Sequence, residues 1–459
     1  MRHTLLLVLL IPFPVTAGEL KVGFGETDVT PELGKKPFYL AGFGQDRKAT
    51  GVHDPLMARA VVFADGTDKV AMVCVDVVGI FRPNVETIRS ALPGFRYVLV
   101  SSTHNHQGPD TLGLWGPTPV QNGVNPDFLK RVEAGAVSAV KAAEKALAPA
   151  TARIGTAAAA DLMVDKRLPE VKHDTLTVLA FSAPGSKTLS GLLVQWNNHP
   201  EDLGGANTEI SADFIGAVVK HLKEKYHCPV AYFTGTVGGL MSSLGLVVKD
   251  TAGKNMPIGF PRIDVYGKRI ADRAATAVDA AVPVALAPFA AKTKELLIPV
   301  DNALYRLAWQ LGTLRRDMYI WDGNPTPKEY VRAKDVAKPV GIKTEIGYLK
   351  LGDVDVAVIP GEIYPELVLG KVQDPADPGA DFPDAPMEPG IYAQMKGQYK
   401  MIVGLGNDEL GYIIPKRQWD EKPPYCYGLK KAQYGEQNSV GPEAAPIICG
   451  EFKKLVARK

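Results

Sequence analysis

The sequence predicts a mixed α/β fold in which helices cover sheets. Apolar runs of strand length alternate along the chain with segments whose apolar residues recur at helical spacing. Of the 459 residues, 46% are hydrophobic and 22% are charged, which is the balance of a globular protein with a substantial core. The alternation argues against an all-β sandwich and against a helical bundle.

The predicted strands are short apolar or alternating runs. They cover residues 61–63, 70–78, 97–101, 176–181, 189–196, 230–234, 296–300, 346–351 and 354–359. Helical spacing predicts helices over residues 84–91, 126–148, 212–226, 261–281, 361–369 and 442–456. The segment 374–390, rich in Pro and Asp, and the polar segment 313–339 are predicted loops. Neither is biased enough to divide the chain, so we expect one body.

The first 17 residues have the pattern of a secretory signal peptide. Arg2 precedes the apolar run 5–11, and small residues end at Ala17, where we expect cleavage. The apolar run is too short to span a bilayer, and Pro12 and Pro14 interrupt it. We therefore expect a secreted or periplasmic protein without a transmembrane segment.

Composition and motifs exclude several classes of function. Lys and Arg number 52 against 50 Asp and Glu, a net charge of +2, and no basic stretch follows that could track a nucleic-acid backbone. The glycine-rich pieces lack the spacing of phosphate-binding loops and dinucleotide-binding turns. The Gly-x-Ser-x-Gly motif of the α/β-hydrolases is missing as well. We therefore expect neither a nucleic acid nor a nucleotide as a partner.

The four cysteines include no Cys-x-x-Cys pair, which argues against zinc-ribbon and thioredoxin-type motifs. Cys74 lies in an apolar strand run and is interpreted as a small core residue. Cys426 and Cys449 lie in the loop-rich C-terminal part of a chain that we expect to be exported, where a disulfide is plausible. The sequence leaves open whether these two thiols form that bridge.

Two histidines directly follow the predicted strand 97–101. His104 and His106 are two residues apart, and in an extended segment such side chains point the same way and can reach one cavity. Neutral imidazole is the commonest metal-ligand side chain. Because the chain has only 8 histidines, this pair indicates a site. Two loop histidines that only form hydrogen bonds remain the alternative.

Two further candidates also follow predicted strands. His199 comes after strand 189–196, and Glu362 lies in a Pro-Gly turn after strand 354–359, where we expect a helix to begin. Taken singly, the histidine is typical of a turn before proline, and the glutamate of a partner for a helix dipole. Together with His104 they supply the two histidines and one glutamate of a catalytic zinc site with an open position.

A series of longer motifs runs in a fixed order along the chain. They are Val22-Gly23-Phe24-Gly25-Glu26-Thr27-Asp28-Val29-Thr30, Gly51-Val52-His53-Asp54-Pro55-Leu56-Met57-Ala58-Arg59-Ala60, Val75-Asp76, Ser102-Thr103-His104-Asn105-His106-Gln107-Gly108-Pro109, Asn198-His199-Pro200, Ser211-Ala212-Asp213-Phe214-Ile215-Gly216, Pro360-Gly361-Glu362 and Gly411-Tyr412-Ile413-Ile414-Pro415. In kind and in order they resemble the N-terminal catalytic domain of the neutral (alkaline, non-lysosomal) ceramidases, which are zinc-dependent amidases.

The resemblance implies a fold, a metal and roles for particular residues. It implies a ceramidase-like catalytic domain over residues 18–459, without the family's C-terminal immunoglobulin-like domain. It implies one Zn²⁺ held by His104, His199, Glu362 and Tyr412, and the tyrosine ligand comes from the resemblance alone. It also implies catalytic contacts to the substrate and its carbonyl from His106, Arg167 and Tyr434. A surface arginine and a packed loop aromatic stay open as alternatives for the last two.

The chain departs from the family in one motif. The family's Asn-x-Gly-Asp-x-Ser-Pro-Asn segment falls on residues 236–243, so that Gly239 replaces the aspartate and Met241 replaces the active-site serine. Ser242 is one residue out of register in this comparison. The departure affects the substrate-binding part of the family's site and leaves the implied metal ligands in place.

We interpret the chain as a secreted zinc-dependent hydrolase that uses metal-activated water to cleave an amide bond in an N-acyl sphingolipid or a related N-acyl substrate. Its partner is then a small-molecule or lipid-like substrate, and peripheral contact with a membrane stays open. A non-catalytic metal- or ligand-binding protein on the same fold is the alternative. A barrel-type amidohydrolase also uses His-x-His, but there the motif lies on the first strand, whereas about 100 residues with other predicted strands precede it here.

Overall fold

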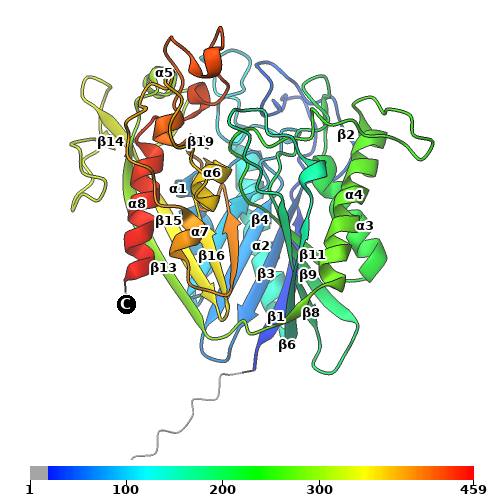
Figure 1. Ribbon diagram of the computed structural model, residues 1–459. Helices are drawn as coiled ribbons and strands as arrows, with labels where there is room; N and C mark the ends of the chain where they lie inside the picture. Colours follow the sequence, from blue (N-terminus) through cyan, green and yellow to red (C-terminus); the bar gives the residue numbers. More distant parts are fainter. Residues whose placement is uncertain (1–18, 459) are drawn as a thin grey trace, which may run out of the picture.

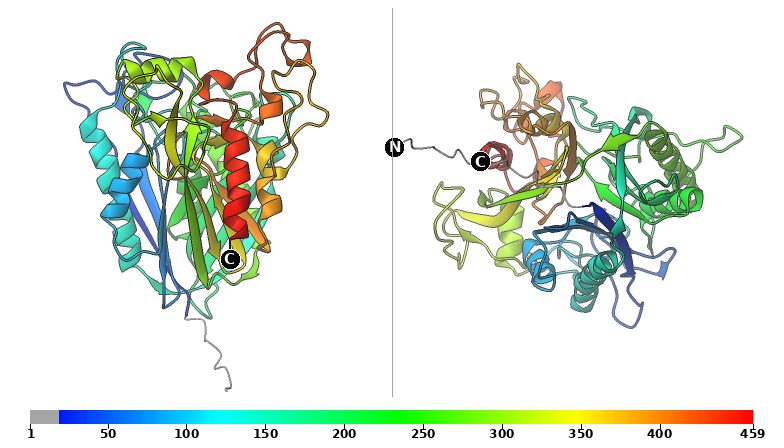
Figure 2. Two further views of the ribbon diagram at one scale, coloured as in Figure 1. Left: turned by 90° about the vertical axis from the view of Figure 1, so that its left-hand side faces the viewer. Right: turned by 90° about the horizontal axis from the view of Figure 1, so that it is seen from below.

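Three sheets, each covered by helices on its outer side, surround a shared apolar core in the computed structural model (Figure 1). The structure describes residues 19–458, so the predicted signal peptide, residues 1–17, lies outside the described residues. The end-on view in Figure 2 shows the three units around the centre, coloured blue to cyan, green, and yellow to red. Their inner faces meet in one cluster that includes Phe63, Phe181 and Val356. The mixed α/β class predicted from the sequence is confirmed.

The first sheet has the strand order β5-β4-β3-β1-β6. Its strands are β1 (Lys21–Asp28), β3 (Met57–Ala64), β4 (Lys69–Val75), β5 (Tyr97–Ser102) and β6 (Ala148–Pro149). Helices α1 (Arg82–Ser90) and α2 (Pro126–Lys145) cover its outer face. The α2 helix lies so close to β1 that a Cβ added to Gly23 would come 2.0 Å from the carbonyl oxygen of Ala143. The N-terminal glycine-rich piece is therefore a strand beneath a helix, which the sequence pattern did not predict.

The second sheet has the order β11-β9-β8-β7-β12. Its strands are β7 (Thr151–Ala158), β8 (Thr175–Ser182), β9 (Leu189–Trp196), β11 (Val230–Thr234) and β12 (Val282–Val284). Helices α3 (Asp213–Tyr226) and α4 (Phe260–Asp279) cover it and share an apolar cluster with its outer face. Both helices carry an apolar stripe toward the sheet, which is the usual reason why such helices form in a folded domain.

The third sheet has the order β13-β15-β16-β18, with β14 paired to β15. Its strands are β13 (Phe289–Pro299), β14 (Tyr319–Ile320), β15 (Val340–Leu351), β16 (Val354–Val358) and β18 (Tyr399–Val403). Helices α6 (Pro365–Leu369), α7 (Ile391–Gln394) and α8 (Ala444–Ala457) pack on its outer side.

Several short elements complete the fold. They are β2 (Gly51–Val52) paired with β10 (Glu209–Ile210), β17 (Glu362–Ile363) paired with β19 (Tyr412–Ile413), helix α5 (Ala303–Gln310), and the 3-10 turns η1 (Ala160–Leu162), η2 (Lys416–Gln418), η3 (Cys426–Gly428) and η4 (Glu436–Asn438).

Each of the three sheets contains one pair of parallel strands, and these pairs position the candidate site. The pairs are β4 with β5, β9 with β11, and β16 with β18. Loops at the carboxyl ends of parallel strands are where open α/β sheets place functional groups. The fold therefore brings three such loop regions, one from each sheet, to a common point.

Most of the predicted elements exist, but the predicted helix 361–369 is wrong at its start. Glu362 and Ile363 form the short strand β17, and the helix begins only at Pro365. The reason is local, because a residue before proline avoids the helical region, and Tyr364 is extended with φ −71° and ψ 138°. The Glu362 carboxylate is therefore not a helix-dipole partner.

Among residues 19–458 all four cysteines are free and buried, so Cys426 and Cys449, whose pairing the sequence left open, do not form a disulfide in this structure. Cys426 begins η3 in the C-terminal loops, whereas Cys449 lies within α8 and belongs to the apolar cluster between this helix and the third sheet. Among residues 19–458 no helix is long and apolar enough to cross a bilayer.

Candidate metal centre

Four loops bring the predicted metal ligands together above the central core. His104 follows β5, His199 follows β9, Glu362 follows β16, and Tyr412 follows β18. In each case a buried strand ends two to nine residues before the candidate side chain, so the rigid sheets determine where the ligands lie. All four side chains are buried, with at most 5% of the residue surface exposed.

His104 is held by an unusual backbone and by one hydrogen bond. Its φ is +67°, a left-handed conformation that a residue with a side chain adopts rarely. Its Nδ1 donates to the carbonyl oxygen of Val78 at 2.7 Å. Because a carbonyl oxygen can only accept a hydrogen bond, this bond places a proton on Nδ1. The lone pair of Nε2 is then the one that could bind a metal ion. That Nε2 lies 3.2 Å from Oε2 of Glu362.

His199 is oriented in the same way from the second sheet. Its Nδ1 donates to the carbonyl oxygen of Met241 at 2.9 Å, and its Nε2 lies 3.0 Å from Oε2 of Glu362. The Met241 side chain packs into the apolar cluster beneath α3 and α4. Met241 therefore contributes its main-chain carbonyl to the site and its side chain to the core.

Glu362 and Tyr412 lie side by side because β17 and β19 pair in parallel, with these two residues in register. The Tyr412 hydroxyl is 3.4 Å from Nε2 of His199. Burial by itself would raise the pKa of Glu362, but the imidazoles of His104 and His199 outweigh it and hold that pKa well below its usual range. Conversely, burial opposes a charge on His104, yet the Glu362 carboxylate raises its pKa to about 9.

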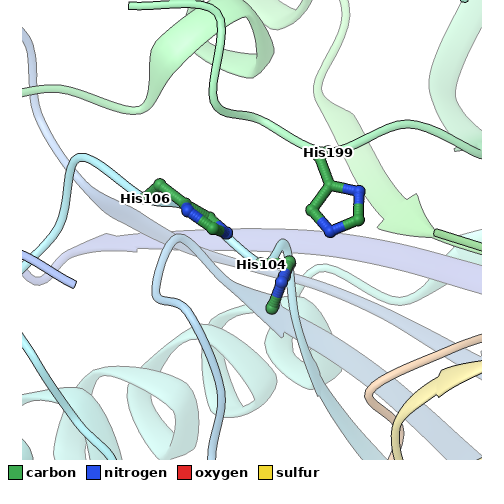
Figure 3. A group of neighbouring side chains, drawn as sticks. All are labelled: His104, His106 and His199. Atoms are coloured by element: carbon green, nitrogen blue, oxygen red, sulfur yellow. The ribbon is translucent and has the colours of Figure 1, made fainter. Parts of the chain in front are cut away.

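His106 is the third imidazole of the group (Figure 3). One nitrogen from each of His104, His106 and His199 lies within 4.8 Å of the other two. Neither ring nitrogen of His106 has a hydrogen-bond partner among residues 19–458. Burial, and then the neighbouring imidazoles, lower its pKa well below the usual value, so the ring stays neutral. A neutral, unpartnered imidazole can serve as a ligand or as a hydrogen-bonding group.

The donor set fits a metal of the zinc type. Zinc bonds to nitrogen and oxygen are about 2.0–2.2 Å long, so neighbouring ligands on a tetrahedral ion lie roughly 3.3–3.5 Å apart. The distances of 3.0, 3.2 and 3.4 Å among His104, His199, Glu362 and Tyr412 come within a few tenths of an ångström of that value. Where imidazole and carboxylate groups share a proton, a metal ion can bind to the same groups and displace that proton.

A pocket opens onto these ligands. His104, His106, Glu362 and Tyr412 line its polar side. Its remaining wall is largely apolar and comes from Phe81, Leu112, Leu114, Trp115, Leu314, Ile342, Leu410 and Val440. This lining is typical of a site for a small molecule with a substantial apolar part.

Of the two remaining predicted residues, Tyr434 and Arg167, only Tyr434 lines the pocket. Tyr434 lines the pocket, is 47% exposed, and packs its ring edge-on against Tyr412. Arg167 does not line the pocket. Its guanidinium forms a buried bidentate pair with Glu436 at 2.6 and 2.8 Å and donates to the carbonyl oxygen of Tyr434 at 2.9 Å. In this structure Arg167 holds the loop that carries Tyr434.

Two acidic residues near the site were not predicted from the sequence. Glu409 lines the pocket three residues before Tyr412, and its position in a turn between β18 and β19 was the signal that could have revealed it. Glu201, two residues after His199, accepts a short hydrogen bond from the Ser242 hydroxyl. Ser242 is therefore already engaged with a buried carboxylate, and it forms a bridge to His199.

Comparisons with known proteins identify a family and similar folds. Residues 20–243 match the family described as neutral/alkaline non-lysosomal ceramidase, N-terminal. The fold is similar to the crystal structure of neutral ceramidase from Pseudomonas aeruginosa, with a TM-score of 0.71 and 16% identity over 95% of this chain and 74% of that one. A ceramidase complexed with C2 gives a TM-score of 0.69 and 15% identity over 95% and 75% of the two chains. No curated protein matches the sequence.

Proposed function

The chain belongs to the neutral/alkaline non-lysosomal ceramidase family, and from this premise we propose that it is a secreted zinc-dependent hydrolase that cleaves the amide bond of an N-acyl sphingolipid or a related N-acyl substrate. One observation carries the proposal. The free nitrogens of His104 and His199 converge on one oxygen of Glu362, at 3.2 and 3.0 Å, on the wall of a largely apolar pocket.

We assign the metal to His104, His199, Glu362 and Tyr412. When bound there, zinc would supply a Lewis acid for the scissile carbonyl and lower the pKa of water. The backbone carbonyls of Val78 and Met241 keep the two imidazoles in the ligand tautomer. A ligand set of the three imidazoles alone is less favoured, because it would leave the buried Glu362 carboxylate without a role.

His106 and Tyr434 are the groups of this chain that face the substrate. Both line the pocket beside the ligands. The Tyr434 hydroxyl oxygen accepts a hydrogen bond from Nδ2 of Asn438 at 2.6 Å, so the phenolic proton of Tyr434 is left to be donated to another group. A hydroxyl or imidazole N–H that points at the carbonyl oxygen would stabilise the charge that develops there, an effect worth about 3–4 kcal/mol per donor. The apolar wall would bind the acyl chain and exclude water from it.

Export and membrane contact are part of the proposal. Residues 1–17 have the pattern of a signal peptide. Helix α5 contributes Tyr305 to the pocket, while Leu304, Leu307 and Leu311 on and after it are exposed by 63%, 52% and 51%. Apolar side chains at this spacing beside the pocket suit peripheral contact with the lipid surface that would hold the substrate.

A non-catalytic ligand-binding protein is the second candidate. The observation that favours it is Met241, whose side chain is fully buried in the core where the family carries an active-site serine. Such a protein would keep the metal and the pocket and show no turnover.

The first experiment is metal analysis of the purified chain together with hydrolysis of fluorogenic N-acyl substrates before and after chelation. We expect about one zinc per chain in the wild type and in His221→Ala, a control histidine on α3, and none in His199→Ala. Turnover should follow the metal. Stoichiometric zinc without turnover would favour the binding protein, and absence of zinc from the wild type would refute both assignments.

A further inference from the structure

The imidazole ring of His106 is held in place without a hydrogen bond to either of its nitrogens. The ring lines the pocket beside His104 and lies close to His199 (Figure 3). Neither of its nitrogens has a partner in the part of the chain that the structure describes. In the other two imidazoles, by contrast, Nδ1 donates to a main-chain carbonyl oxygen. The orientation of the His106 ring therefore depends on the groups packed around it.

Three of these groups belong to one loop, residues 42–47. Gly42 lies directly against the ring, because a Cβ added there would be 2.2 Å from Nδ1 of His106. The Phe43 ring packs against the imidazole at 5.5 Å between ring centres and an angle of 67°. Arg47 donates from Nη2 to the main-chain carbonyl oxygen of His106 at 2.8 Å. The loop thus contacts both the ring and the backbone of His106.

The backbone of Phe43 is strained. Its φ is +56°, between values of +73° at Gly42 and +136° at Gly44. Glycine adopts such a conformation freely, whereas a bulky side chain does so at an energetic cost. The Phe43 side chain lines the pocket and is 44% exposed, so its burial offsets only part of this cost. A strained and half-exposed aromatic residue at the edge of a pocket indicates a role in the site.

The Phe43 ring is itself held from two other sides. The guanidinium of Arg47, a buried side chain, lies over the ring at 5.3 Å from its centre. Gly205, in the loop after His199, also lies against Phe43, since a Cβ added to this glycine would be 3.0 Å from the Cβ of Phe43 and 3.2 Å from its Cγ. Any larger residue at position 205 would crowd the phenyl ring. The position of the ring is thus fixed, and with it one wall of the space in which His106 can turn.

We propose that Phe43 is a positioning residue for His106: its ring holds the imidazole so that Nε2 faces away from the loop and toward the reacting carbonyl group. Nδ1 is the ring nitrogen that lies against Gly42, which leaves Nε2 on the opposite side of the ring. This inference rests on the proposed function, in which His106 acts on the substrate carbonyl. Phe43 has no polar side-chain atom, so its effect on the reaction passes through the orientation of His106.

The kinetic test uses a short, water-soluble N-acyl substrate, for which contact between the acyl chain and the Phe43 ring is small. Phe43→Asn removes the ring and suits the left-handed backbone, because asparagine tolerates that conformation. We expect kcat to fall by about 10- to 100-fold with little change in KM, since a contact made in the transition state is weakened. Phe43→Tyr keeps the ring and should retain the wild-type kcat. An unchanged kcat, with a KM that rises as the acyl chain lengthens, would overturn the inference, because Phe43 would then only bind the chain.

Tyr427→Asn is the matched control. Tyr427 is also an aromatic residue with a left-handed backbone, φ +57°, but it does not line the pocket. Its replacement should leave kcat and KM at their wild-type values. Thermal unfolding then tests whether Phe43 serves only to hold the fold together. The midpoint for Phe43→Asn should be no lower than that of the wild type, because the substitution relieves strain and exposes little apolar surface. A clearly lower midpoint would assign Phe43 a structural role and contradict the proposal.

Nuclear magnetic resonance separates this inference from the proposed reaction, because it needs no turnover. Histidine labelled with ¹³C at Cε1 reports the motion of each ring, and the signal that is missing from His106→Ala identifies His106. Its order parameter should fall in Phe43→Asn and keep the wild-type value in Phe43→Tyr and Tyr427→Asn. A ring that stays equally ordered in Phe43→Asn overturns the inference, whether or not any amide is cleaved. If the wild type cleaves no amide and the ring still loosens, the positioning role holds and only the proposed function is refuted.

Discussion

At the scale of single residues, Arg167 shows how a side chain can belong to a site without touching the pocket. Its donors go to both oxygens of Glu436 and to the carbonyl oxygens of Gln418 and Tyr434. Its guanidinium also lies over the ring of Tyr364, 5.7 Å from the ring centre. With both partners 3% exposed, the pair with Glu436 is a buried ion pair. Removing one partner of such a pair is strongly destabilising, because the other charge then stays buried without compensation.

Arg167→Met should destabilise the protein by about 3–5 kcal/mol, because Glu436 would stay buried without its cation. Adding Glu436→Leu should restore most of this loss, since the second change removes the unpaired charge. Denaturant unfolding of the two variants and of the wild type measures both values. If Arg167→Met lost activity at unchanged stability, the guanidinium would instead be acting on the substrate.

At the scale of elements, helix α5 exposes an unusual number of large apolar side chains for a short helix on the surface. None of its residues is buried, yet Tyr305 lines the pocket and Leu304 and Leu307 point outward. Figure 1 shows α5 at the same end of the molecule as β19, the strand that carries Tyr412. Exposed leucines on a helix beside an apolar pocket are an energetic cost unless a partner covers them.

Replacing Leu304, Leu307 and Leu311 together by Ser should weaken binding to phosphatidylcholine vesicles by about 100-fold, assuming about 1 kcal/mol for each partly inserted leucine. Hydrolysis of a water-soluble short-chain substrate should stay at the wild-type rate, because the metal ligands are untouched. Vesicle co-sedimentation and the two rates measure this. Val282→Ser, an equally simple loss of an exposed apolar side chain on β12, is the control and should bind like the wild type. Vesicle binding that survives in the triple variant would contradict the assignment.

The elements show how far sequence patterns reach. Strands β9 and β11 were predicted at their observed bounds, because buried central strands read as continuous apolar runs. The His-x-His pair, His199 and Glu362 were recognisable as strand-end residues, and Tyr412 only through a resemblance. Glu409 was recognisable only as a turn residue between β18 and β19. The role of Arg167 was not predictable, since it depends on contacts with Glu436 and Tyr434, which are far away in the chain. Strand β1 was missed because its glycines are required by α2 and not by a turn.

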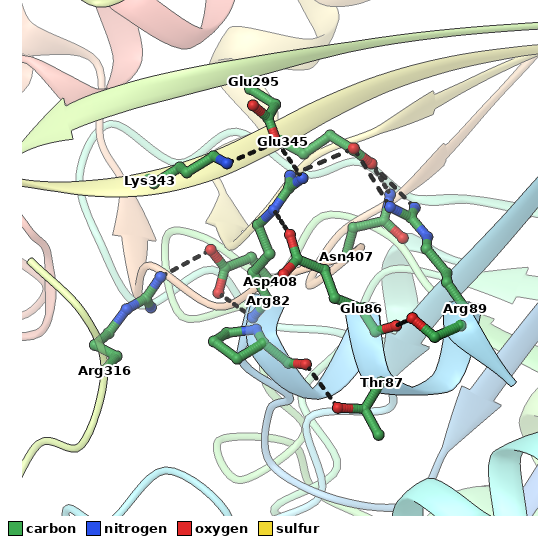
Figure 4. A network of polar contacts seen from close by, with 12 residues as sticks. Arg82, Glu86, Thr87, Arg89, Glu295, Arg316, Lys343, Glu345, Asn407 and Asp408 are labelled. Carbon is green, nitrogen blue, oxygen red and sulfur yellow. Dashed lines mark hydrogen bonds and ion pairs between the residues drawn. The ribbon is translucent and has the colours of Figure 1, made fainter. Parts of the chain in front are cut away.

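At the scale of the whole molecule, the candidate metal centre is the point where the three helix-covered sheets meet. His104 comes from the first sheet, His199 from the second, and Glu362 and Tyr412 from loops of the third. A second link lies beside it, where Glu345 of β15 pairs with Arg82 and Arg89 of α1 (Figure 4). The sheets are thus joined by a shared apolar core, by this polar network and by the ligand cluster.

Zinc bound at this junction should stabilise all three sheets together. A ligand that binds only the folded state adds about 4 kcal/mol to the free energy of unfolding when its free concentration is 1,000 times Kd. Chelation should therefore lower the stability by that order and increase amide hydrogen exchange near the carboxyl ends of β5, β9 and β16 alike. His199→Ala, which removes one ligand, should show no dependence of stability on zinc. Because the ligands come from three separate sheets, a change in exchange confined to one of them would mean that the ion binds elsewhere.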